Sequence, residues 1–394
     1  MIALPMRRLW FVPCALGAAL VVVGPVASVR AAPALPAVTL RVSDRVIAYG
    51  QYVRFSGHIS PRSAGQTVAI ENGKGRILAK ATTDFEGRYH VRAKPRRNIL
   101  AHAQWAAVAS DPVRIGVRPR LTASRTAIRL FGITVVRGTL VPAHAHSHID
   151  VMVVRNGRPV QRYRPMLRWD GRFRVGIRIL HPGTQSVVVH FDDADHLGVA
   201  WRSNPATPPL PGLRIGSNNI YVRFLEWRLA DLHYRVYAQD SRFDYHDSDS
   251  VVAFHKVQGM ARTGVVDTAT WYRLARPIVP VIRGPKFGNH FEVNLTKQVV
   301  MYVHRGRIAG ILHASTGKPS TPTRPGNFRV WSKQPGFNSE GMFYSSFFDG
   351  NRALHGYHDV PVYAASHGCV RLPFWHARWV YNRATIGTQV LVYN

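Results

Sequence analysis

Side chains able to do covalent chemistry gather near the carboxyl end of the chain. Cys369 follows His355, His358 and His367 and precedes Arg371 by two positions. A cysteine reacts as its thiolate, so it needs a neighbouring imidazole, a positive charge or backbone N–H groups to lower its pKa. Here His355 or His367 can supply the base and Arg371 the charge. The stretch therefore predicts a cysteine nucleophile for acyl transfer.

Gly368 stands directly before this thiol. The missing side chain lets the backbone turn tightly and lets a substrate carbonyl approach. The N–H groups of His367, Gly368 and Cys369 would then point together at a developing oxyanion. Acyl transfer by a thiol needs neither metal nor cofactor, so none is predicted.

Two other interpretations of these residues stay open. The three histidines and Cys369 include enough ligand types for a tetrahedral zinc site, although no second cysteine supports it. Cys369 could instead be an inert buried residue, the common fate of a free cysteine. The Ser-His-Gly-Cys turn and the following Arg371 form a polar setting, which argues against an inert buried cysteine.

The same residues resemble a known family. His355 and the run Ser366–Leu372, reading Ser-His-Gly-Cys-Val-Arg-Leu, are similar to the signature of the L,D-transpeptidases, whose catalytic domain is of the YkuD type. Residues 315–318 and 321–328 resemble that family's Ser-Thr-Gly and Thr-Pro-x-Gly-x-Phe blocks. The resemblance covers residues 286–394 and implies a mostly β domain with Cys369 at the base of a cleft.

The resemblance also implies a reaction. Cys369 would attack the amide between the third and fourth residues of a peptidoglycan stem peptide and release the terminal D-alanine. The resulting thioester would pass to the side-chain amine of a diamino acid on another stem, making a 3→3 cross-link. The partners implied are therefore stem peptides and glycan strands.

Roles for single residues follow from the resemblance. His355 corresponds to the base, oriented by a backbone carbonyl from near Gly356, with Asp359 as an alternative orienter. His367 and Gly368 shape the oxyanion loop. Substrate contacts are expected from Ser366, Arg371 and Tyr344. The interval from His355 to Cys369 is short for the family, so the loop 360–364 should alter the rim of the cleft.

Other segments must position this chemistry. A proline-rich linker is expected at residues 205–214, after which apolar residues recur at helical spacing. Short helices are expected from Val222 through Leu232, at 250–257 and at 268–275, and a further one near 374–382. The order Gln-Gly, Thr-Gly-x-x-Asp and Trp within 258–271 resembles peptidoglycan-binding modules. A three-helix domain of that kind is predicted over 215–277, with a plain helical linker as the alternative.

An internal repeat precedes the linker. Glycines and prolines of residues 54–61 recur in step at 135–142, and short alternating runs are separated by glycine turns. Such spacing is typical of antiparallel β-sandwiches. Two immunoglobulin-like domains are predicted, at 36–118 and 119–204. Within the second, His144, His146 and His148 should share one strand face, and without an acidic or cysteine partner nearby a solvated edge is favoured over a metal site.

The amino terminus and the overall charge indicate where the protein works. Arg7 and Arg8 precede an apolar run to Val29, so residues 1–34 are predicted to be a signal peptide or an uncleaved membrane anchor. The rest should be extracytoplasmic, in the cell wall or periplasm. Lys and Arg total 52 against 21 Asp and Glu, a net charge of +31, which suits an anionic wall. Arginine is spread over every segment, which argues against nucleic-acid binding.

The sequence thus predicts a multidomain, mainly β protein: two immunoglobulin-like repeats, a three-helix peptidoglycan-binding bundle and a carboxyl-terminal L,D-transpeptidase domain. An L,D-carboxypeptidase would use the same thioester and give it to water. A non-catalytic wall-binding protein is the other alternative, which the presence of Cys369 and His355 disfavours.

Overall fold

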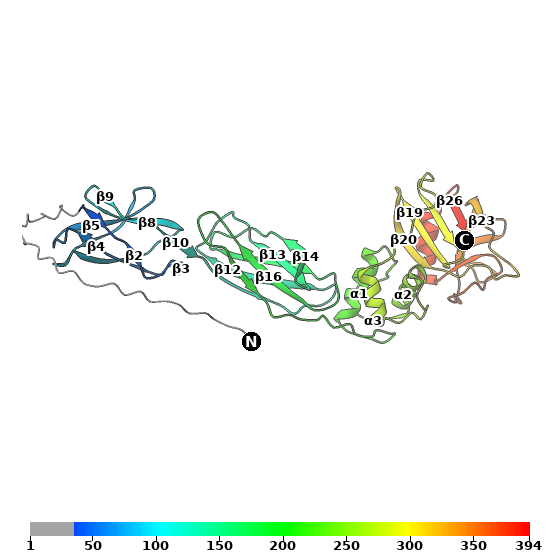
Figure 1. Cartoon of the computed structure of the whole chain (residues 1–394). Coiled ribbons are helices and arrows are strands. Elements are labelled where there is room, and N and C mark those ends of the chain that lie inside the picture. Colours follow the sequence, from blue (N-terminus) through cyan, green and yellow to red (C-terminus); the bar gives the residue numbers. More distant parts are fainter. Residues whose placement is uncertain (1–34) are drawn as a thin grey trace, which may run out of the picture. The chain divides into compact units, whose positions relative to one another are not determined.

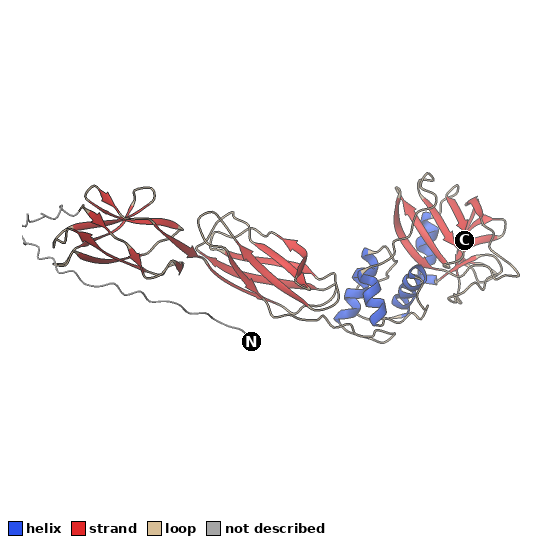
Figure 2. Cartoon of the chain, in the orientation of Figure 1, coloured by secondary structure: helices blue, strands red, loops and turns tan. Residues whose placement is uncertain are grey.

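The computed structural model describes residues 35–394, and the predicted leader at 1–34 lies outside them. The described chain divides into two compact units. The first holds residues 35–45, 52–94 and 99–114, and the second holds 46–51, 95–98 and 115–394. Strands dominate up to residue 202, and helices enter only afterwards (Figure 2). Among the described residues, no helix combines the length and apolarity needed to cross a bilayer.

Unit one is built from two small antiparallel sheets. In the first sheet, β4 lies between β1 and β2, and β7 also pairs with β4. In the second, β5 lies between β6 and β8, and β9 pairs with β8. The strands are β1 (Ala37–Val38), β2 (Arg41–Val42), β4 (Val53–Ser60), β5 (Thr67–Asn72), β6 (Ile77–Thr82), β7 (Arg88–Ala93), β8 (Ile99–Trp105) and β9 (Val108–Ala109). β3 (Val46–Ala48) pairs in parallel with β10 (Val113–Arg118) through residues of unit two.

Unit two begins with a second sandwich (Figure 1). Its sheets have the orders β11-β12-β15 and β14-β13-β16-β17. The strands are β11 (Arg120–Arg125), β12 (Ile133–Val141), β13 (Asp150–Arg155), β14 (Arg158–Tyr163), β15 (Arg172–Arg178), β16 (Gln185–Phe191) and β17 (Val199–Arg202). Alternate residues of the strands, such as Val151, Val153, Val187 and Val189, fill the core between the sheets.

Two glycines of the sequence repeat lie in similar surroundings. Gly57 on β4 and Gly138 on β12 each lie where a Cβ atom would collide with a backbone carbonyl oxygen and an aromatic ring. The ring belongs to Tyr89 in one sandwich and to Phe173 in the other. Glycine is therefore required at both places by close approach of the neighbouring strand and ring.

One expectation for the second sandwich is wrong. His144, His146 and His148 do not share a strand face, because the chain turns here instead of extending. The N–H of Ser147 donates to the carbonyl of His144 at 3.1 Å, and His146 has a positive φ of 65°. The alternation expected for an extended strand therefore does not apply to these three residues.

Three helices follow, and capping residues fix where they begin. They are α1 (Ile220–Asp231), α2 (Tyr245–Gln258) and α3 (Thr268–Ala275), the last with the predicted bounds. α2 starts earlier than predicted because Asp244 caps it and Asp247 completes a capping box. Gly259 ends α2 in the left-handed conformation. Trp271, Phe254 and Leu225 are central to the buried core of these helices.

The carboxyl-terminal domain consists of two sheets and one helix, α4 (Phe374–Arg383). The sheet orders are β20-β19-β18-β26-β21 and β22-β23-β24-β25. The strands are β18 (His290–Asn294), β19 (Val299–His304), β20 (Arg307–His313), β21 (Gly326–Arg329), β22 (Ser332–Phe337), β23 (Phe343–Asp349), β24 (Arg352–Gly356), β25 (Val370–Leu372) and β26 (Gln389–Tyr393). Phe291, Val300, Leu354 and Val390 belong to the core of this domain.

The helices and the carboxyl-terminal domain share a core. Val299, Met301 and Ile311 of β19 and β20 pack in the same buried cluster as the helices. The segment after α1 also joins the edge of β20: the N–H of Arg235 donates to the carbonyl of Ile311, and the N–H of Ile311 donates to the carbonyl of His233. The helical segment is therefore built onto the sheet.

Candidate active site

Two neighbouring parallel strands bring the predicted base and nucleophile together. His355 of β24 lies opposite Arg371 of β25, and Leu354 lies opposite Val370. Cys369 directly precedes β25, so it is level with Ala353. The N–H of Ala353 faces the Cys369 sulfur, and the thiol donates to the Asn351 carbonyl at 3.7 Å. The order of the sheet thus places His355 and Cys369 on adjacent strands, two register positions apart.

The His355 ring is held by a backbone carbonyl, as predicted. Its Nδ1 lies 2.9 Å from the carbonyl oxygen of Gly356. A carbonyl only accepts, so Nδ1 carries the ring proton and Nε2 is left with a free lone pair. Asp359, the alternative orienter, lies instead against Arg371, with its Oδ2 3.7 Å from the guanidinium.

Burial keeps both reacting groups neutral in the resting site. It lowers the pKa of His355 to about 4, helped by the nearby charge of Arg371. It also raises the pKa of the Cys369 thiol, against the opposing effects of the Ala353 N–H, Arg352 and Arg371. A neutral thiol beside a neutral imidazole suits general-base catalysis, in which the proton moves as the sulfur attacks.

The turn that carries Cys369 is closed by Ser366. Its hydroxyl donates to the carbonyl of Cys369 at 2.6 Å and accepts the N–H of Gly368 at 3.0 Å. Ser366 is only 1% exposed. The expected substrate contact is therefore replaced by a structural role, because the side chain is buried and both of its bonds lie within the turn.

The same turn changes the expected oxyanion loop. The Gly368 N–H is committed to Ser366, so it does not point at a substrate. Within residues 35–394, the N–H groups of His367 and Cys369 donate to no backbone carbonyl. These two N–H groups are available for an oxyanion. Gly368 still contributes its conformation, a φ of +116°, and its lack of a Cβ, which would lie 2.7 Å from Nε of Arg352.

Two upstream segments brace the turn. Ser315 forms a reciprocal pair of backbone hydrogen bonds with Arg371, and the Thr316 carbonyl accepts from the N–H of Ser366. Thr323 donates its hydroxyl to the Gly368 carbonyl at 2.8 Å, and Thr321 donates to the Ser366 carbonyl at 3.1 Å. The Ser-Thr-Gly and Thr-Pro blocks noted in the sequence therefore fix the backbone around the nucleophile.

The remaining predicted residues lie around this turn in different settings. Arg371 stacks over the ring of Tyr357 at 4.3 Å. His367 is exposed, with Nε2 3.3 Å from Nζ of Lys318. Tyr344 has a φ of 53° and packs against Tyr381 of α4 at a ring distance of 5.1 Å. Within the described chain Tyr344 forms no hydrogen bond or ring contact with Cys369 or His355, so its expected place in the cleft has no support.

Sequence reasoning missed a charged cluster beside the thiol. The carboxylate of Asp349, at the end of β23, forms an ion pair with Arg352 at 3.2 Å and a second ion pair with Arg324. Arg352 reaches from there to Gly368 and Cys369. Arg324 and Asp349 lie outside the run from His355 to Leu372 that the sequence motif covers, and the pairing of β23, β24 and β25 brings Asp349 and Arg352 to it.

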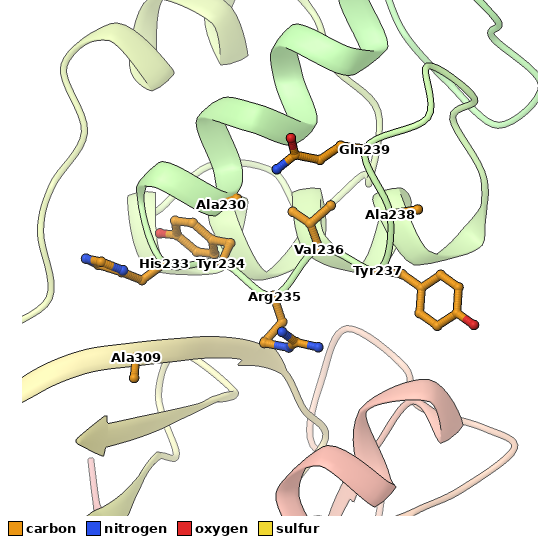
Figure 3. Close-up of a pocket in the computed structure, with 9 residues that line it drawn as sticks. All are labelled: Ala230, His233, Tyr234, Arg235, Val236, Tyr237, Ala238, Gln239 and Ala309. Carbon is orange, nitrogen blue, oxygen red and sulfur yellow. The ribbon is translucent and has the colours of Figure 1, made fainter.

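A second candidate region is a groove of about 290 Å³ beside the helices. The loop after α1 lines it, from His233 to Gln239, together with Ala230 and Ala309 (Figure 3). At one end Tyr237 is 64% exposed and stacks on His246 at 4.4 Å. The indole of Trp375, on α4, meets both rings edge-on. None of these residues belongs to the turn around Cys369.

Comparison with known proteins identifies the carboxyl-terminal domain. Residues 288–392 match the family described as the L,D-transpeptidase catalytic domain, YkuD. A solved L,D-transpeptidase fragment from Xylanimonas cellulosilytica is 32% identical, and the match covers 47% of this chain and 100% of that one, with a TM-score of 0.45. Comparison with curated proteins found no match.

Two further solved structures are more distant. An L,D-transpeptidase from Mycobacterium tuberculosis is 22% identical over 27% of this chain and 58% of its own, with a TM-score of 0.26. A fused Zn-dependent amidase/peptidase/peptidoglycan-binding domain protein from Clostridium acetobutylicum is 19% identical over 47% of this chain and 100% of its own, with a TM-score of 0.24.

Proposed function

Since residues 288–392 are an L,D-transpeptidase catalytic domain, through which the chain belongs to that family, we propose that this protein is an exported enzyme that cross-links peptidoglycan by way of a Cys369 thioester. The observation that supports the proposal is the pairing of β24 with β25, which brings His355 and Cys369 onto adjacent strands, while the Gly356 carbonyl holds the Nδ1 proton of His355.

Acylation follows from this geometry. Nε2 of His355 takes the thiol proton as Sγ attacks the carbonyl carbon of the third stem residue. The carbonyl oxygen becomes an oxyanion and receives the N–H groups of His367 and Cys369. When the intermediate collapses, the C–N bond breaks, and the imidazolium returns its proton to the departing amine of D-alanine.

The second half of the reaction, transfer of the acyl group to the acceptor amine, uses the same groups. The free amine of a diamino acid on another stem attacks the thioester, and His355 accepts its proton. The C–S bond breaks, a 3→3 amide forms, and the thiolate regains the proton from His355. Water in place of the amine would give a tripeptide, the carboxypeptidase outcome.

The helical segment is proposed to hold the glycan. Exposed aromatic rings stack on sugar faces, and Tyr237 with His246 and Trp375 forms such a platform beside the groove shown in Figure 3. Because these helices share a core with the catalytic sheet, a glycan bound there would be held at a fixed distance from Cys369.

The decisive test replaces the nucleophile. The protein is incubated with a purified disaccharide-tetrapeptide and analysed by mass spectrometry, with Cys369→Ala as control. We expect cross-linked dimer and free D-alanine from the wild type and neither from the variant, while binding to peptidoglycan is retained. Tripeptide without dimer would make the protein a carboxypeptidase. Turnover by Cys369→Ala at the wild-type rate would refute the mechanism.

A further inference from the structure

Three side chains of the second sandwich that can ligate a metal lie close together, far from Cys369 in the sequence. His144 lies in the loop after β12, and Asp193 and His196 lie in the loop between β16 and β17. One potential ligand atom from each lies within 4.8 Å of the others. We propose that His144, Asp193 and His196 bind a divalent transition-metal ion, with Zn²⁺ as the best match to the donors.

The distances suit a tetrahedral ion. Oδ2 of Asp193 lies 3.4 Å from Nδ1 of His144 and 3.2 Å from Nδ1 of His196. Zinc bonds to nitrogen and oxygen are about 2.0–2.1 Å long, so neighbouring ligands of a tetrahedral ion lie about 3.3 Å apart. Two imidazoles and one carboxylate are a common donor set for zinc and leave a fourth position for water.

The contacts of His196 favour a cation at this place. Its Nε2 lies 2.9 Å from the carbonyl oxygen of Arg96, which can only accept, so Nε2 carries a proton. In the neutral ring, Nδ1 is then an acceptor, yet it faces the Asp193 carboxylate at 3.1 and 3.2 Å. Either a second ring proton or a metal ion resolves this contact between two acceptors.

His144 supplies the second imidazole of the donor set. Its Nδ1 also faces Asp193, at 3.4 Å from Oδ2, and the rings of His144 and His196 lie 5.0 Å apart. Nε2 of His144 is buried without a partner in the described chain, so the contact with Asp193 is the polar interaction that orients this ring.

Backbone N–H groups of its own loop hold the Asp193 carboxylate in place. Oδ1 of Asp193 accepts the N–H of Asp195 at 3.0 Å and that of His196 at 2.7 Å. This leaves Oδ2 directed toward the imidazoles, while Arg96 orients His196 from behind. Such supporting hydrogen bonds are typical of built metal sites. The ion would tie together two loops of a sandwich that has no cysteine.

The test uses the full chain with Cys369→Ala, so that the thiol cannot bind the ion. After treatment with a chelator, the protein is titrated with Zn²⁺ in a calorimeter and with Co²⁺ in a spectrophotometer. We expect one equivalent of Zn²⁺, the visible spectrum of tetrahedral Co²⁺, and a higher melting temperature with metal. Asp193→Asn should weaken binding at least about 100-fold and remove the thermal shift, whereas His146→Ala should change neither.

Asp193→Asn keeps an oxygen for the N–H groups of its loop, so the fold should survive, and circular dichroism checks this. Binding by this variant with wild-type affinity would overturn the proposal. So would the absence of both heat and a Co²⁺ spectrum in the parent, which would leave a protonated His196 paired with Asp193. Neither outcome depends on the proposed enzymatic function.

Discussion

At the scale of single residues, the reactive site is defined by backbone partners more than by charges. His355 is oriented by the Gly356 carbonyl, and the turn bearing Cys369 is closed by the Ser366 hydroxyl. Burial raises the pKa of the Cys369 thiol in spite of the nearby arginines. Burial and the charge of Arg371 both lower the pKa of the His355 imidazole. Both groups are therefore neutral. Before substrate binds, the site therefore holds a neutral thiol and a neutral imidazole instead of a thiolate–imidazolium ion pair.

This state predicts an unusual pH dependence. The imidazole acts as a base only when deprotonated, and burial lowers the pKa of His355 to about 4. We expect the acid limb of kcat/KM for acylation to lie well below the pH of about 6.5 set by an ordinary histidine. The rate of Cys369 acylation, followed by mass spectrometry between pH 4 and 8, measures this limb.

The His355→Gln variant serves as the control for this profile. It should acylate at least about 100-fold more slowly, and its profile should have no acid limb. A wild-type limb near pH 6.5 would contradict the neutral resting site.

At the scale of elements, the helices are tied to the active-site domain by a buried lysine. Lys256 of α2 is 1% exposed, and its Nζ contacts the carbonyls of Gln298 and Ala314 and Nδ1 of His313. Nε2 of His313 in turn lies 2.8 Å from the carbonyl of Val360, in the loop between His355 and Cys369. A chain of polar contacts therefore runs from the helices to the rim of the site.

Replacing this lysine should destabilise the protein in a pH-dependent way. Burial lowers the pKa of Lys256, helped by the charge of Arg262 and opposed by that of Asp249. Lys256→Met leaves the acceptors around Nζ without a donor, which should cost about 1–3 kcal/mol of unfolding free energy near neutral pH. Urea unfolding monitored by circular dichroism measures the difference.

The sign of the pH effect follows from proton linkage. With its folded pKa below the unfolded one, Lys256 binds fewer protons in the folded state, so it makes the wild type more stable as pH rises from about 6 toward 10. The deficit of Lys256→Met should therefore be larger at pH 9 than at pH 7. Lys286→Met, at an exposed position, should match the wild type at both values. An equal deficit at both values would show that Lys256 titrates normally.

The elements also show what the sequence could and could not predict. The motif around Cys369, the His355 partner and the bounds of α3 were predictable because each depends on residues close together in the chain. The Arg324–Asp349–Arg352 cluster and the grouping of His144 with Asp193 and His196 were not, because Arg324 and His144 join their partners only through the folding of distant segments. The sequence also did not predict that the Gly368 N–H donates to the Ser366 hydroxyl, which makes it unavailable to an oxyanion.

At the scale of the whole molecule, charge and aromatic contacts should make separable contributions to binding. A net charge of +31 attracts any anionic polymer, and salt screens that attraction. Stacking of Tyr237 on a sugar ring would be insensitive to salt. We therefore expect binding of the Cys369→Ala protein to purified peptidoglycan to weaken steadily as NaCl is raised, as measured by sedimentation.

Tyr237→Ala separates the two contributions. Loss of one stacking ring should weaken binding by about 0.5–1.5 kcal/mol at every salt concentration, so the salt dependence keeps its slope. Tyr272→Ala, an exposed tyrosine of α3 outside the groove, is the matched control and should bind like its parent. If Tyr237→Ala instead changed the slope or had no effect, the groove would not hold glycan. Retention on the wall would then rest on charge alone, with the helices serving to brace the catalytic sheet through Lys256.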